Sequence, residues 1–476
     1  MNNVNNTSDY INSYININDD ILKQLIYKPG YIKTVFSNKT IITYADYIAS
    51  GLASPIIEKW IEKRIYPYYS NTHSNAHNGQ MMKNLINQTK SYIREQFNID
   101  MNYQILFPGS GTTAAINHLT NSINWTLYEK VKIYLTLYEH YSNHLPWVEI
   151  HNIHSHVDIN YIPFEQNTSN SGIIDLNWLK NSIQTDYIKS NENIGKTLII
   201  CSITACSNIN GIINPLTDIK QILNMFGSND KFHSYLFADF ACSAPYVQID
   251  GNLFDAFFFS PHKFIGGIET PGVLIGKSCL FEKTKPFCSG GGCVKKATSK
   301  KIIYETDIER RESAGTPNII GIIKLKKILE LKAKMYSTIK INEHILCKLI
   351  KEKIIEFESK YSTFRSILYA DNYEHLPILS FNLSNLHYNL IVVLFNDLFG
   401  IQTRGGIGCC GLLAEYMENI YEIKGWCRIS FHWLMNIHTV LNIFKALEFI
   451  IQNSHKYVKL YKYDSSLNLF TFIESK

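Results

Sequence analysis

The sequence predicts an α/β fold with a mostly parallel sheet and a smaller α+β domain in the C-terminal part. From about residue 80 onward, short β-rich runs alternate with stretches whose apolar residues follow helical spacing. Between residues 103 and 123, a strand pattern, a glycine-rich turn and a helix pattern follow one another directly. Such alternation is typical of parallel sheets, which bind ligands beyond the carboxyl ends of their strands. Residues that directly follow the strand patterns are therefore the first site candidates.

Individual stretches support each element of this fold in turn. The apolar spacing of 81–98 predicts a helix, and a long helix near 312–336 leads to a second unit. The further β-rich runs of the first unit lie at 130–142, 195–204, 234–241, 255–264 and 271–277. The second unit contains 376–385, a helix at 388–400, and 426–434. We therefore expect an N-terminal segment that packs on the small domain (1–40), a large domain (41–325) and a small domain (326–476).

The composition excludes several classes of protein. The 476 residues are 45% hydrophobic and 18% charged, which is ordinary for a globular chain. The net charge of +5 is small for this length, and the basic stretch 290–301 is interpreted as a solvated loop, so no nucleic-acid partner is expected. The ten cysteines form no CxxC pair, which argues against a metal site and fits a reducing compartment. Without a signal peptide, transit peptide or membrane-spanning run, we expect a cytoplasmic protein that needs no membrane.

Lys263 follows an apolar run in "FFFSPHKFIGG", residues 257–267, where an ordinary surface lysine is badly placed. Apolar and aromatic neighbours disfavour the ammonium form, which lowers the pKa of a lysine and makes its amine a nucleophile toward carbonyls. The alternative is a strand-end lysine that extends its charged group into water. A lysine nucleophile of this kind needs a carbonyl cofactor, so other parts of a cofactor site should follow neighbouring strands.

Three further stretches supply such parts. Asp239 ends the strand pattern in "LFADFACSAPY" and can keep a pyridine nitrogen protonated, as pyridoxal phosphate (PLP) requires. The turn "FPGSGTTAAIN", residues 107–117, opens a helix whose backbone N–H groups suit a phosphate. His140 follows another strand and is flat enough to stack on a cofactor ring. Each residue alone is explained equally well as a cap, a turn former or a structural histidine, but together their order and spacing indicate a cofactor site.

The order of these residues resembles the class V aminotransferase family of PLP-dependent enzymes, of fold type I, which includes the cysteine desulfurases. The resemblance runs from about residue 45, in "YADYIASG", to about residue 450, and includes the glycines 290–292 and "RRESAGTPNIIG" at 310–321. It implies a mostly parallel, seven-stranded sheet in the large domain. It also implies a homodimer whose sites lie at the subunit interface.

The resemblance further implies a role for each candidate residue. In that family the Ser-x-His-Lys motif carries the Schiff-base lysine, which corresponds to Lys263. The implied phosphate contacts come from Gly111, Thr112, Ser260 and His262, and from Thr316 toward the partner subunit. Asp239 corresponds to the partner of the ring nitrogen, His140 to the stacking and catalytic histidine, and Asn208 to a residue near the ring oxygen or the substrate.

Cys242 departs from the family's pattern. Three residues after the aspartate, desulfurases usually carry a glutamine that donates a hydrogen bond to the ring oxygen of the cofactor. A thiol is a poor donor. The contact to the ring oxygen is therefore expected to be weakened or supplied by another group.

The C-terminal stretches carry the residues that select the reaction. "GWCRISF" contains Arg428, and "IQTRGGIGCCG" contains Arg404 followed by Cys409 and Cys410. A guanidinium group pairs bidentately with a carboxylate, and the resemblance implies that Arg428 holds the carboxylate of the substrate. Arg404 corresponds to the arginine that opens the family's cysteine loop and is the second expected substrate-binding residue. The resemblance also aligns Cys409 with the thiolate that attacks the substrate sulfur, with Cys410 as the second choice. The alternatives are surface arginines and an incidental cysteine.

Three hypotheses for the function follow. The first is a cysteine desulfurase-like enzyme that converts L-cysteine to L-alanine, leaves a persulfide on Cys409 and passes the sulfur to an acceptor protein. The second is an aminotransferase, an epimerase or another lyase for carbon–sulfur or carbon–selenium bonds, in which Cys409 is not a nucleophile. The third is a protein that keeps the PLP fold for binding alone. None of the three involves a metal.

Overall fold

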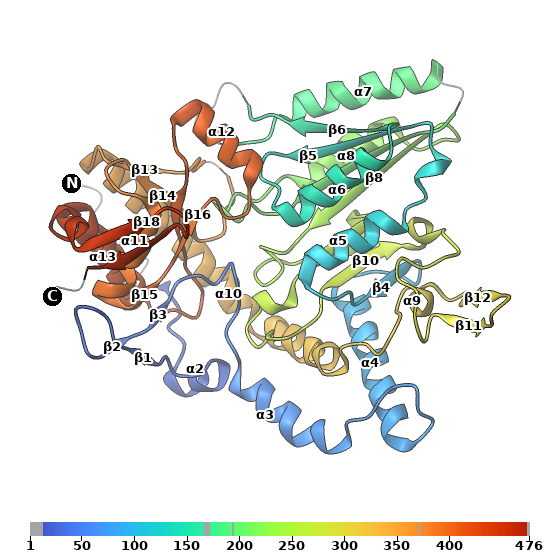
Figure 1. Cartoon of the computed structure of the whole chain (residues 1–476), viewed down its shortest axis with the longest axis horizontal. Helices are drawn as coiled ribbons and strands as arrows, with labels where there is room; N and C mark the ends of the chain where they lie inside the picture. Colours follow the sequence, from blue (N-terminus) through green and yellow to red (C-terminus); the bar gives the residue numbers. More distant parts are fainter. Residues whose placement is uncertain (1–12, 166–171, 193–194, 371–372, 474–476) are drawn as a thin grey trace.

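A seven-stranded sheet lies at the centre of the larger unit of the molecule (Figure 1). The computed structural model describes residues 13–165, 172–192, 195–370 and 373–473. The strand order is β4-β10-β9-β8-β7-β5-β6, with β5 to β9 parallel and β10 antiparallel to both of its neighbours. The strands are β4 (Tyr103–Leu106), β5 (Lys130–Thr136), β6 (Val157–Ile162), β7 (Thr197–Thr204), β8 (Phe232–Asp239), β9 (Ala256–Phe259) and β10 (Val273–Lys277). The predicted α/β fold with its mostly parallel sheet is confirmed, and β6 is a strand that the sequence patterns did not single out.

Helices cover both faces of this sheet, which explains why its central strands are apolar along their length. They are α5 (Gly111–Ser122) and α6 (Tyr141–Ile153) on one face, and α7 (Leu176–Glu192) and α8 (Leu216–Phe226) on the other. Every residue of β7 is buried, as expected for a parallel strand between two helical layers. In β9, Phe258 packs toward α5 and α6, whereas Phe257 and Phe259 pack toward the opposite layer.

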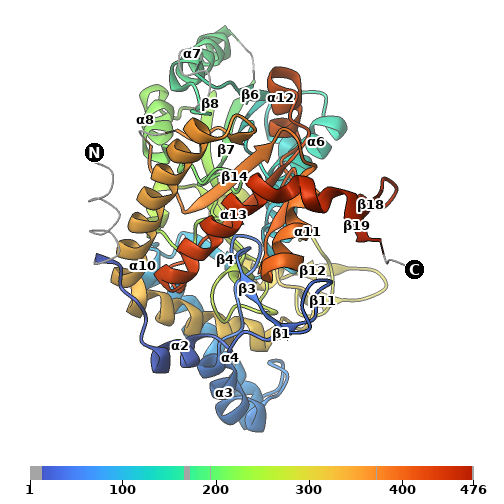
Figure 2. The same ribbon diagram turned by 90° about the vertical axis from the view of Figure 1, so that its left-hand side faces the viewer.

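The 42-residue helix α10 (Ile319–Lys360) joins the large sheet to a smaller unit. Its first turns pack in the core of the large sheet through Leu325 and Leu329, and its later turns, from Ile339 onward, pack in the core of the smaller unit. The expected boundary between residues 325 and 326 therefore lies inside this helix. Figure 2 shows the length of α10, with α13 (Ile437–Tyr457) beside it.

The smaller unit is α+β, with an antiparallel sheet of order β13-β14-β17-β16. The strands and helices of this unit, besides α10 and α13, are β13 (Phe364–Ser366), β14 (Ile378–Leu383), α11 (Tyr388–Phe399), β15 (Ile401–Gln402), β16 (Arg404–Gly406), α12 (Gly411–Tyr421), β17 (Trp426–Ser430), β18 (Tyr461–Asp464) and β19 (Leu469–Phe472). Arg404 of β16 and Arg428 of β17 are direct partners across the antiparallel pair. The sheet thereby places two of the predicted site residues side by side.

The N-terminal part of the chain packs on the smaller unit up to residue 48, whereas its helices at 55–64 and 77–96 pack against the large sheet and the first turns of α10. Its elements are α2 (Asp19–Leu25), β1 (Tyr31–Ile32), β2 (Thr40–Ile41), β3 (Thr43–Tyr44), α3 (Pro55–Arg64) and α4 (His77–Gln96). β3 runs parallel to β15, and the Tyr14 hydroxyl donates a hydrogen bond of 2.8 Å to the carbonyl oxygen of Met435. Just after β3, Asp46 forms a β-bridge with Ser430. Residues 1–12 of the expected N-terminal segment lie outside the described residues.

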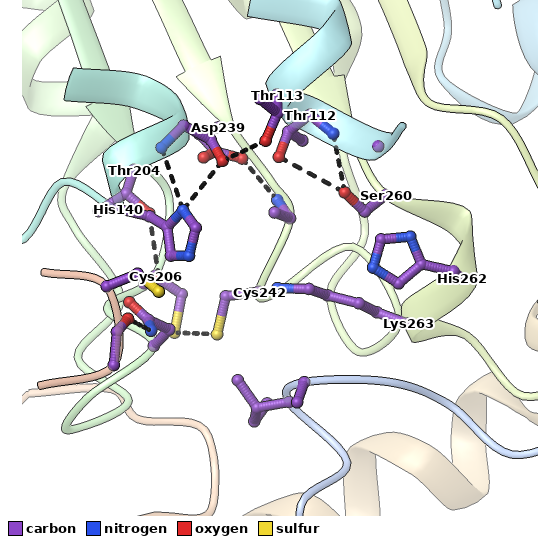
Figure 3. A pocket seen from close by; sticks show the side chains of 18 of the residues that line it. Thr112, Thr113, His140, Thr204, Cys206, Asp239, Cys242, Ser260, His262 and Lys263 are labelled. Carbon is purple, nitrogen blue, oxygen red and sulfur yellow. Dashed lines mark hydrogen bonds between the residues drawn. The ribbon is translucent and has the colours of Figure 1, made fainter. Parts of the chain in front are cut away.

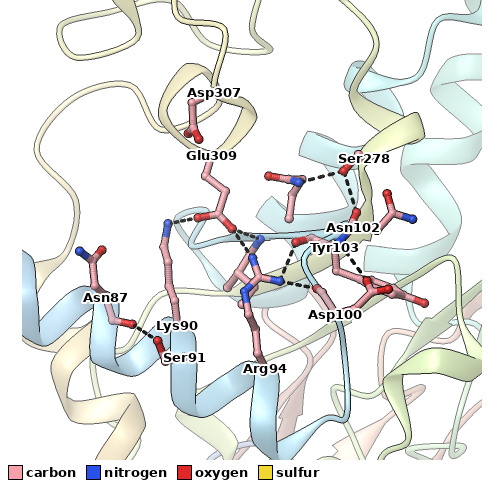
Figure 4. Close-up of polar contacts among 12 residues, drawn as sticks. Asn87, Lys90, Ser91, Arg94, Asp100, Asn102, Tyr103, Ser278, Asp307 and Glu309 are labelled. Carbon is pink, nitrogen blue, oxygen red and sulfur yellow. Dashed lines mark hydrogen bonds and ion pairs between the residues drawn. The ribbon is translucent and has the colours of Figure 1, made fainter.

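An ion-pair network anchors the short helix α9 (Ile308–Arg311), which precedes α10 (Figure 4). Glu309 accepts hydrogen bonds from Lys90 Nζ at 2.6 Å and Arg94 Nη2 at 3.1 Å, both on α4. The same carboxylate accepts the backbone N–H of Ile105, in β4, at 2.8 Å. The preceding basic stretch 290–301, expected to be a solvated loop, contributes to an exposed hairpin of β11 (Val294–Ala297) and β12 (Ile302–Tyr304).

Candidate active site

The predicted site residues meet at the carboxyl edge of the large sheet (Figure 3). All but one of them line a single pocket: Gly111, Thr112, His140, Asn208, Asp239, Ser260, His262, Lys263, Arg404, Cys409 and Arg428. The large sheet supplies one side of this pocket, and the loop and strand around β16 and β17 supply the other. This is the edge where parallel α/β sheets hold their ligands.

The turn before α5 is built to accept an anion. Gly111 has a φ of +58°, and a Cβ atom there would lie 2.7 Å from Ser260 Oγ, so only glycine fits. Ser260 Oγ accepts the backbone N–H of Thr112 at 2.9 Å, which ties β9 to the first turn of α5. The free N–H groups at the start of a helix attract phosphate. The geometry therefore suits a phosphate group between α5 and Ser260.

Lys263 lies in the 3-10 turn Pro261–Lys263, directly after β9. Its side chain extends toward Cys242 (Figure 3). Burial lowers the pKa of its ammonium group, and the nearby Cys242 and Asp239 only partly oppose this. A lysine amine with a lowered pKa is a better nucleophile toward an aldehyde.

Asp239 is the last residue of β8 and is buried. One carboxylate oxygen, Oδ1, accepts the backbone N–H of Ala241 at 2.8 Å. Burial raises the pKa of Asp239 to about 6, against the opposing effects of that N–H group and Lys263. A buried carboxylate of this kind gains most from a cationic partner, such as a protonated ring nitrogen.

His140 caps α6 from the end of the loop that follows β5. Its Nδ1 accepts the backbone N–H of Ser142 at 3.1 Å, and the Ser142 hydroxyl also contacts Thr113 Oγ1 at 2.6 Å. Burial, and then the charge of Lys263, lowers the pKa of His140 to about 4. The ring is therefore neutral at pH 7, and since Nδ1 accepts a hydrogen bond, its proton is on Nε2.

Cys242, at the position of the family's glutamine, pairs with a second thiol. Its Sγ lies 3.9 Å from Sγ of Cys206, and both cysteines line the pocket. The hydrogen bond between the two thiols lowers the pKa of Cys242, whereas burial raises the pKa of Cys206. The glutamine amide is thus replaced by a buried thiol pair next to Lys263.

Asn208 is engaged with the cysteine loop. Its Nδ2 donates to the carbonyl oxygen of Gly408 at 2.9 Å, and its Oδ1 accepts from Cys410 Sγ at 3.0 Å. Its own carbonyl oxygen accepts from Arg428 Nη1 at 2.9 Å. Asn208 therefore holds the loop and the arginine in place from the large-domain side of the pocket.

The two cysteines of the loop have opposite environments. Cys409 is exposed and lines the pocket, while Cys410 is fully buried. Burial raises the pKa of the Cys410 thiol well above its ordinary value. Cys409 has a φ of +58°, an uncommon conformation for a residue with a side chain, and its carbonyl oxygen accepts the N–H of Tyr141 at 2.8 Å. This contact fixes the loop to the start of α6, next to His140.

Asp46 joins both arginines and was not foreseen from the sequence. Its Oδ1 accepts from Arg428 Nη2 at 2.7 Å, and its Oδ2 accepts from Arg404 Nε at 2.9 Å. Asp46 and Arg428 are buried, whereas the side chain of Arg404 is 49% exposed. Within "YADYIASG" the only signal was an aspartate after a short strand pattern, which says nothing about distant partners. Cys206, two residues before Asn208, was likewise not singled out.

Thr316 is the predicted site residue that does not line this pocket. It lies with Gly315 in a second hollow beside the start of α5, and its Oγ1 accepts from Asn71 Nδ2 at 3.0 Å. Within the part of the chain that the structure describes, no group of three or more histidine, cysteine or carboxylate side chains is arranged to hold a metal. Among the same residues, no helix is both long enough and apolar enough to cross a membrane.

A mostly parallel, seven-stranded sheet with a partly buried lysine at its carboxyl edge defines the fold type I architecture. A model of the class V aminotransferases matches residues 43–442. A cysteine desulfurase of Wigglesworthia glossinidia brevipalpis is 30% identical over 422 residues, 86% of this chain and 93% of that protein. A probable cysteine desulfurase of Borreliella burgdorferi is 29% identical over 432 residues, 88% of this chain and 93% of that protein. The chain therefore belongs to the class V aminotransferase family, whose members are PLP-dependent enzymes.

Solved structures show the same fold. The apo structure of a cysteine desulfurase from Thermococcus onnurineus superposes with a TM-score of 0.71 at 22% identity, covering 87% of this chain and 95% of that one. The cysteine desulfurase CsdA of Escherichia coli gives a TM-score of 0.68 at 21% identity, covering 86% and 94%. At these identities the likeness establishes the architecture, and the seven-stranded sheet implied by the sequence resemblance is confirmed.

Proposed function

We propose that this protein is a PLP-dependent cysteine desulfurase that converts L-cysteine to L-alanine and retains the sulfur as a persulfide on Cys409. The observation that carries the proposal is one pocket lined by a partly buried lysine, a buried aspartate, a buried arginine and an exposed cysteine: Lys263, Asp239, Arg428 and Cys409. Relatives described as cysteine desulfurases at 30% and 29% identity support this reaction.

The residues present fit PLP. Gly111 leaves room beside Ser260 that any Cβ atom would fill, which suits the phosphate group. Asp239, a buried carboxylate, would hold the ring nitrogen, and Lys263, an amine with a lowered pKa, would hold the aldehyde carbon. Once bound there, PLP supplies an electron sink for bonds next to the amino group of the substrate.

The chain's own residues supply orientation, proton transfer and the nucleophile. Arg428 would bind the substrate carboxylate, and neutral His140, with its proton on Nε2, would donate or accept a proton at that atom. The thiolate of Cys409 forms a bond to the substrate sulfur while the bond from that sulfur to Cβ breaks. A proton then takes the place of sulfur on Cβ, so cysteine leaves as alanine.

The choice of Cys409 over Cys410 rests on exposure. A nucleophilic sulfur must be a thiolate and must reach the substrate. Cys410 is fully buried, burial raises the pKa of its thiol, and its Sγ donates to Asn208. Cys409 is exposed on the pocket wall, where an acceptor protein could also collect the sulfur.

We further propose that the enzyme is a homodimer in which Thr316 contacts the phosphate site of the partner subunit. Two observations support this. Thr316 lies outside the pocket that contains Lys263, and the ion pairs of Glu309 anchor the short helix that leads to it. A monomeric holoenzyme in analytical ultracentrifugation would contradict the dimer without affecting the reaction proposed for Cys409.

The test of the reaction is the Cys409→Ala variant, assayed for sulfide release from L-cysteine with a thiol reductant present. We expect release to be abolished, while the visible absorbance of bound cofactor and its spectral response to L-cysteine persist. Cys279→Ala, which removes another exposed cysteine, is the matched control and should release sulfide normally.

Two results would contradict desulfuration. They are unchanged sulfide release by Cys409→Ala, and no release by the native enzyme. Formation of a keto acid from an amino acid, with no sulfide, would instead indicate an aminotransferase in which Cys409 is not a nucleophile.

A further inference from the structure

Arg404 and Arg428 lie so close together that their positive charges would repel each other without a neighbouring anion. They are direct partners on adjacent antiparallel strands, where like charges repel and destabilise the pair. Asp46 lies against both, with one carboxylate oxygen on each guanidinium group at 2.9 and 2.7 Å. Its backbone is fixed by the β-bridge to Ser430 and by the Tyr44 hydroxyl, which donates to the Asp46 carbonyl oxygen at 3.0 Å. The Asp46 carboxylate is therefore held in a fixed position, where it pairs with both arginines.

This arrangement sets the charge that a substrate meets. Two guanidinium groups and one carboxylate leave a single net positive charge at this end of the pocket. Arg428 retains donors for a ligand, among them its buried Nε–H, which has no hydrogen-bond partner among the described residues. Unpaired buried donors are rare, so an acceptor is expected there when substrate binds. One ligand carboxylate would neutralise the remaining positive charge and accept a hydrogen bond from the Nε–H of Arg428.

We propose that Asp46 is a specificity-determining residue, which restricts the site to amino acids with a single carboxylate and disfavours those whose side chains are also anionic. The inference deepens the proposed function and rests on it only in requiring that an amino acid binds in this pocket. Arg404, half-exposed in β16, lines the same pocket as Cys409, toward which the substrate side chain must point for its sulfur to be attacked. Because Asp46 already pairs with Arg404, a second substrate anion finds no free cation there.

The test is a spectral titration of the holoenzyme with L-alanine and L-aspartate, neither of which contains sulfur. The native enzyme should bind L-alanine more tightly than L-aspartate. In Asp46→Asn, which keeps the shape and removes the charge, the ratio of the two dissociation constants should shift toward L-aspartate by about tenfold, equivalent to about 1.4 kcal/mol. Asp46→Glu should keep the native preference. Glu448→Gln, which removes a surface ion pair with Lys360, is the matched control and should change neither constant.

The proposal is overturned if Asp46→Asn binds cofactor normally and keeps the native ratio. If that variant does not fold, Arg404→Gln decides, because its ion pair is half-exposed. With Arg404 absent, Asp46 neutralises Arg428, so both amino acids should bind more weakly by a similar factor. A loss confined to L-aspartate would show that Arg404 was a free cation and would overturn the proposal.

The titration also separates this inference from the proposed reaction. If the native enzyme binds both amino acids with the expected preference but releases no sulfide from L-cysteine, desulfuration fails and the role of Asp46 stands. If neither amino acid changes the spectrum, no amino acid binds, and both proposals fail together.

Discussion

The two sides of the pocket are built in different ways. On the large-domain side, Gly111, Asp239 and Lys263 each lie at or just after the end of a strand of one sheet, so the sheet alone brings them together. On the small-domain side, Arg428 depends on Asp46, from which it is separated by 382 residues in the sequence. Local sequence motifs at strand ends determine the first side, whereas contacts between distant parts of the folded chain determine the second. Variants on the two sides should therefore fail differently, through cofactor chemistry on one and through substrate binding and folding on the other.

Lys263→Ala should give the largest effect on the large-domain side. We expect kcat to fall by roughly a thousandfold or more, the scale on which loss of a nucleophile reduces catalysis. The visible absorbance that depends on the covalent link to this lysine should disappear, while the far-UV circular dichroism stays native. Native absorbance in the variant would show that another group anchors the cofactor.

Arg428→Gln should be the most damaging change on the small-domain side. It leaves the buried Asp46 without its buried partner, which typically costs about 3–5 kcal/mol of folding free energy. Arg404→Gln breaks the half-exposed ion pair and should cost no more than about 1 kcal/mol. Urea unfolding of the two variants measures the difference. Equal losses of unfolding free energy would mean that the buried and the half-exposed ion pair of Asp46 stabilise the fold to the same extent.

Asp239→Asn should lower kcat by roughly a hundredfold to a thousandfold, as expected when one preorganised charge opposite a developing charge is lost. The asparagine can still accept the N–H of Ala241, so the fold should be unchanged. Steady-state kinetics with L-cysteine, together with cofactor absorbance, checks this. Complete loss of cofactor from the variant would mean that Asp239 is needed to bind the cofactor, not only to stabilise charge on its ring.

His432, in the core of the small domain, tests the stability of that side of the molecule through pH rather than through the ion pairs of Asp46. Its buried ring stacks on Tyr47 with centroids 4.1 Å apart, and burial lowers its pKa to about 3. Because the unfolded chain takes up a proton near pH 6.5, this histidine stabilises the fold above that pH and loses its contribution as the pH falls. Between pH 7 and 5 the loss should be about 2 kcal/mol.

The control for this pH effect is His432→Gln, which has no ring to protonate. Chemical unfolding at both pH values should show a smaller fall in stability for the variant than for the native chain. An equal fall in the two proteins would assign the pH dependence to other groups, such as His140.

The sequence was most informative where function depends on adjacent residues. Lys263 and Asp239 could be predicted because one follows and the other ends an apolar strand, and strand ends converge in a parallel sheet. β6 escaped notice because, as an edge strand, it has partly exposed polar residues such as Asp158 and Asn160 instead of an apolar run.

Long-range contacts could not be predicted. The ion pairs of Asp46 with Arg404 and Arg428 join residues 358 and 382 positions apart, and no local pattern encodes such a meeting. The contrast between Cys409 and Cys410 has the same origin. The two thiols are adjacent in sequence, and only the packed structure makes one exposed and the other buried.

Helix α10 has a consequence for how the protein unfolds. One continuous helix contributes Leu329 to the core of the large sheet and Ile339 to the core of the small unit. Melting either core removes the packing that keeps part of this helix formed, so each half depends on the other for its stability. The enzyme should therefore unfold in one cooperative transition, and a chain cut between residues 325 and 326 should yield two fragments that cannot fold separately.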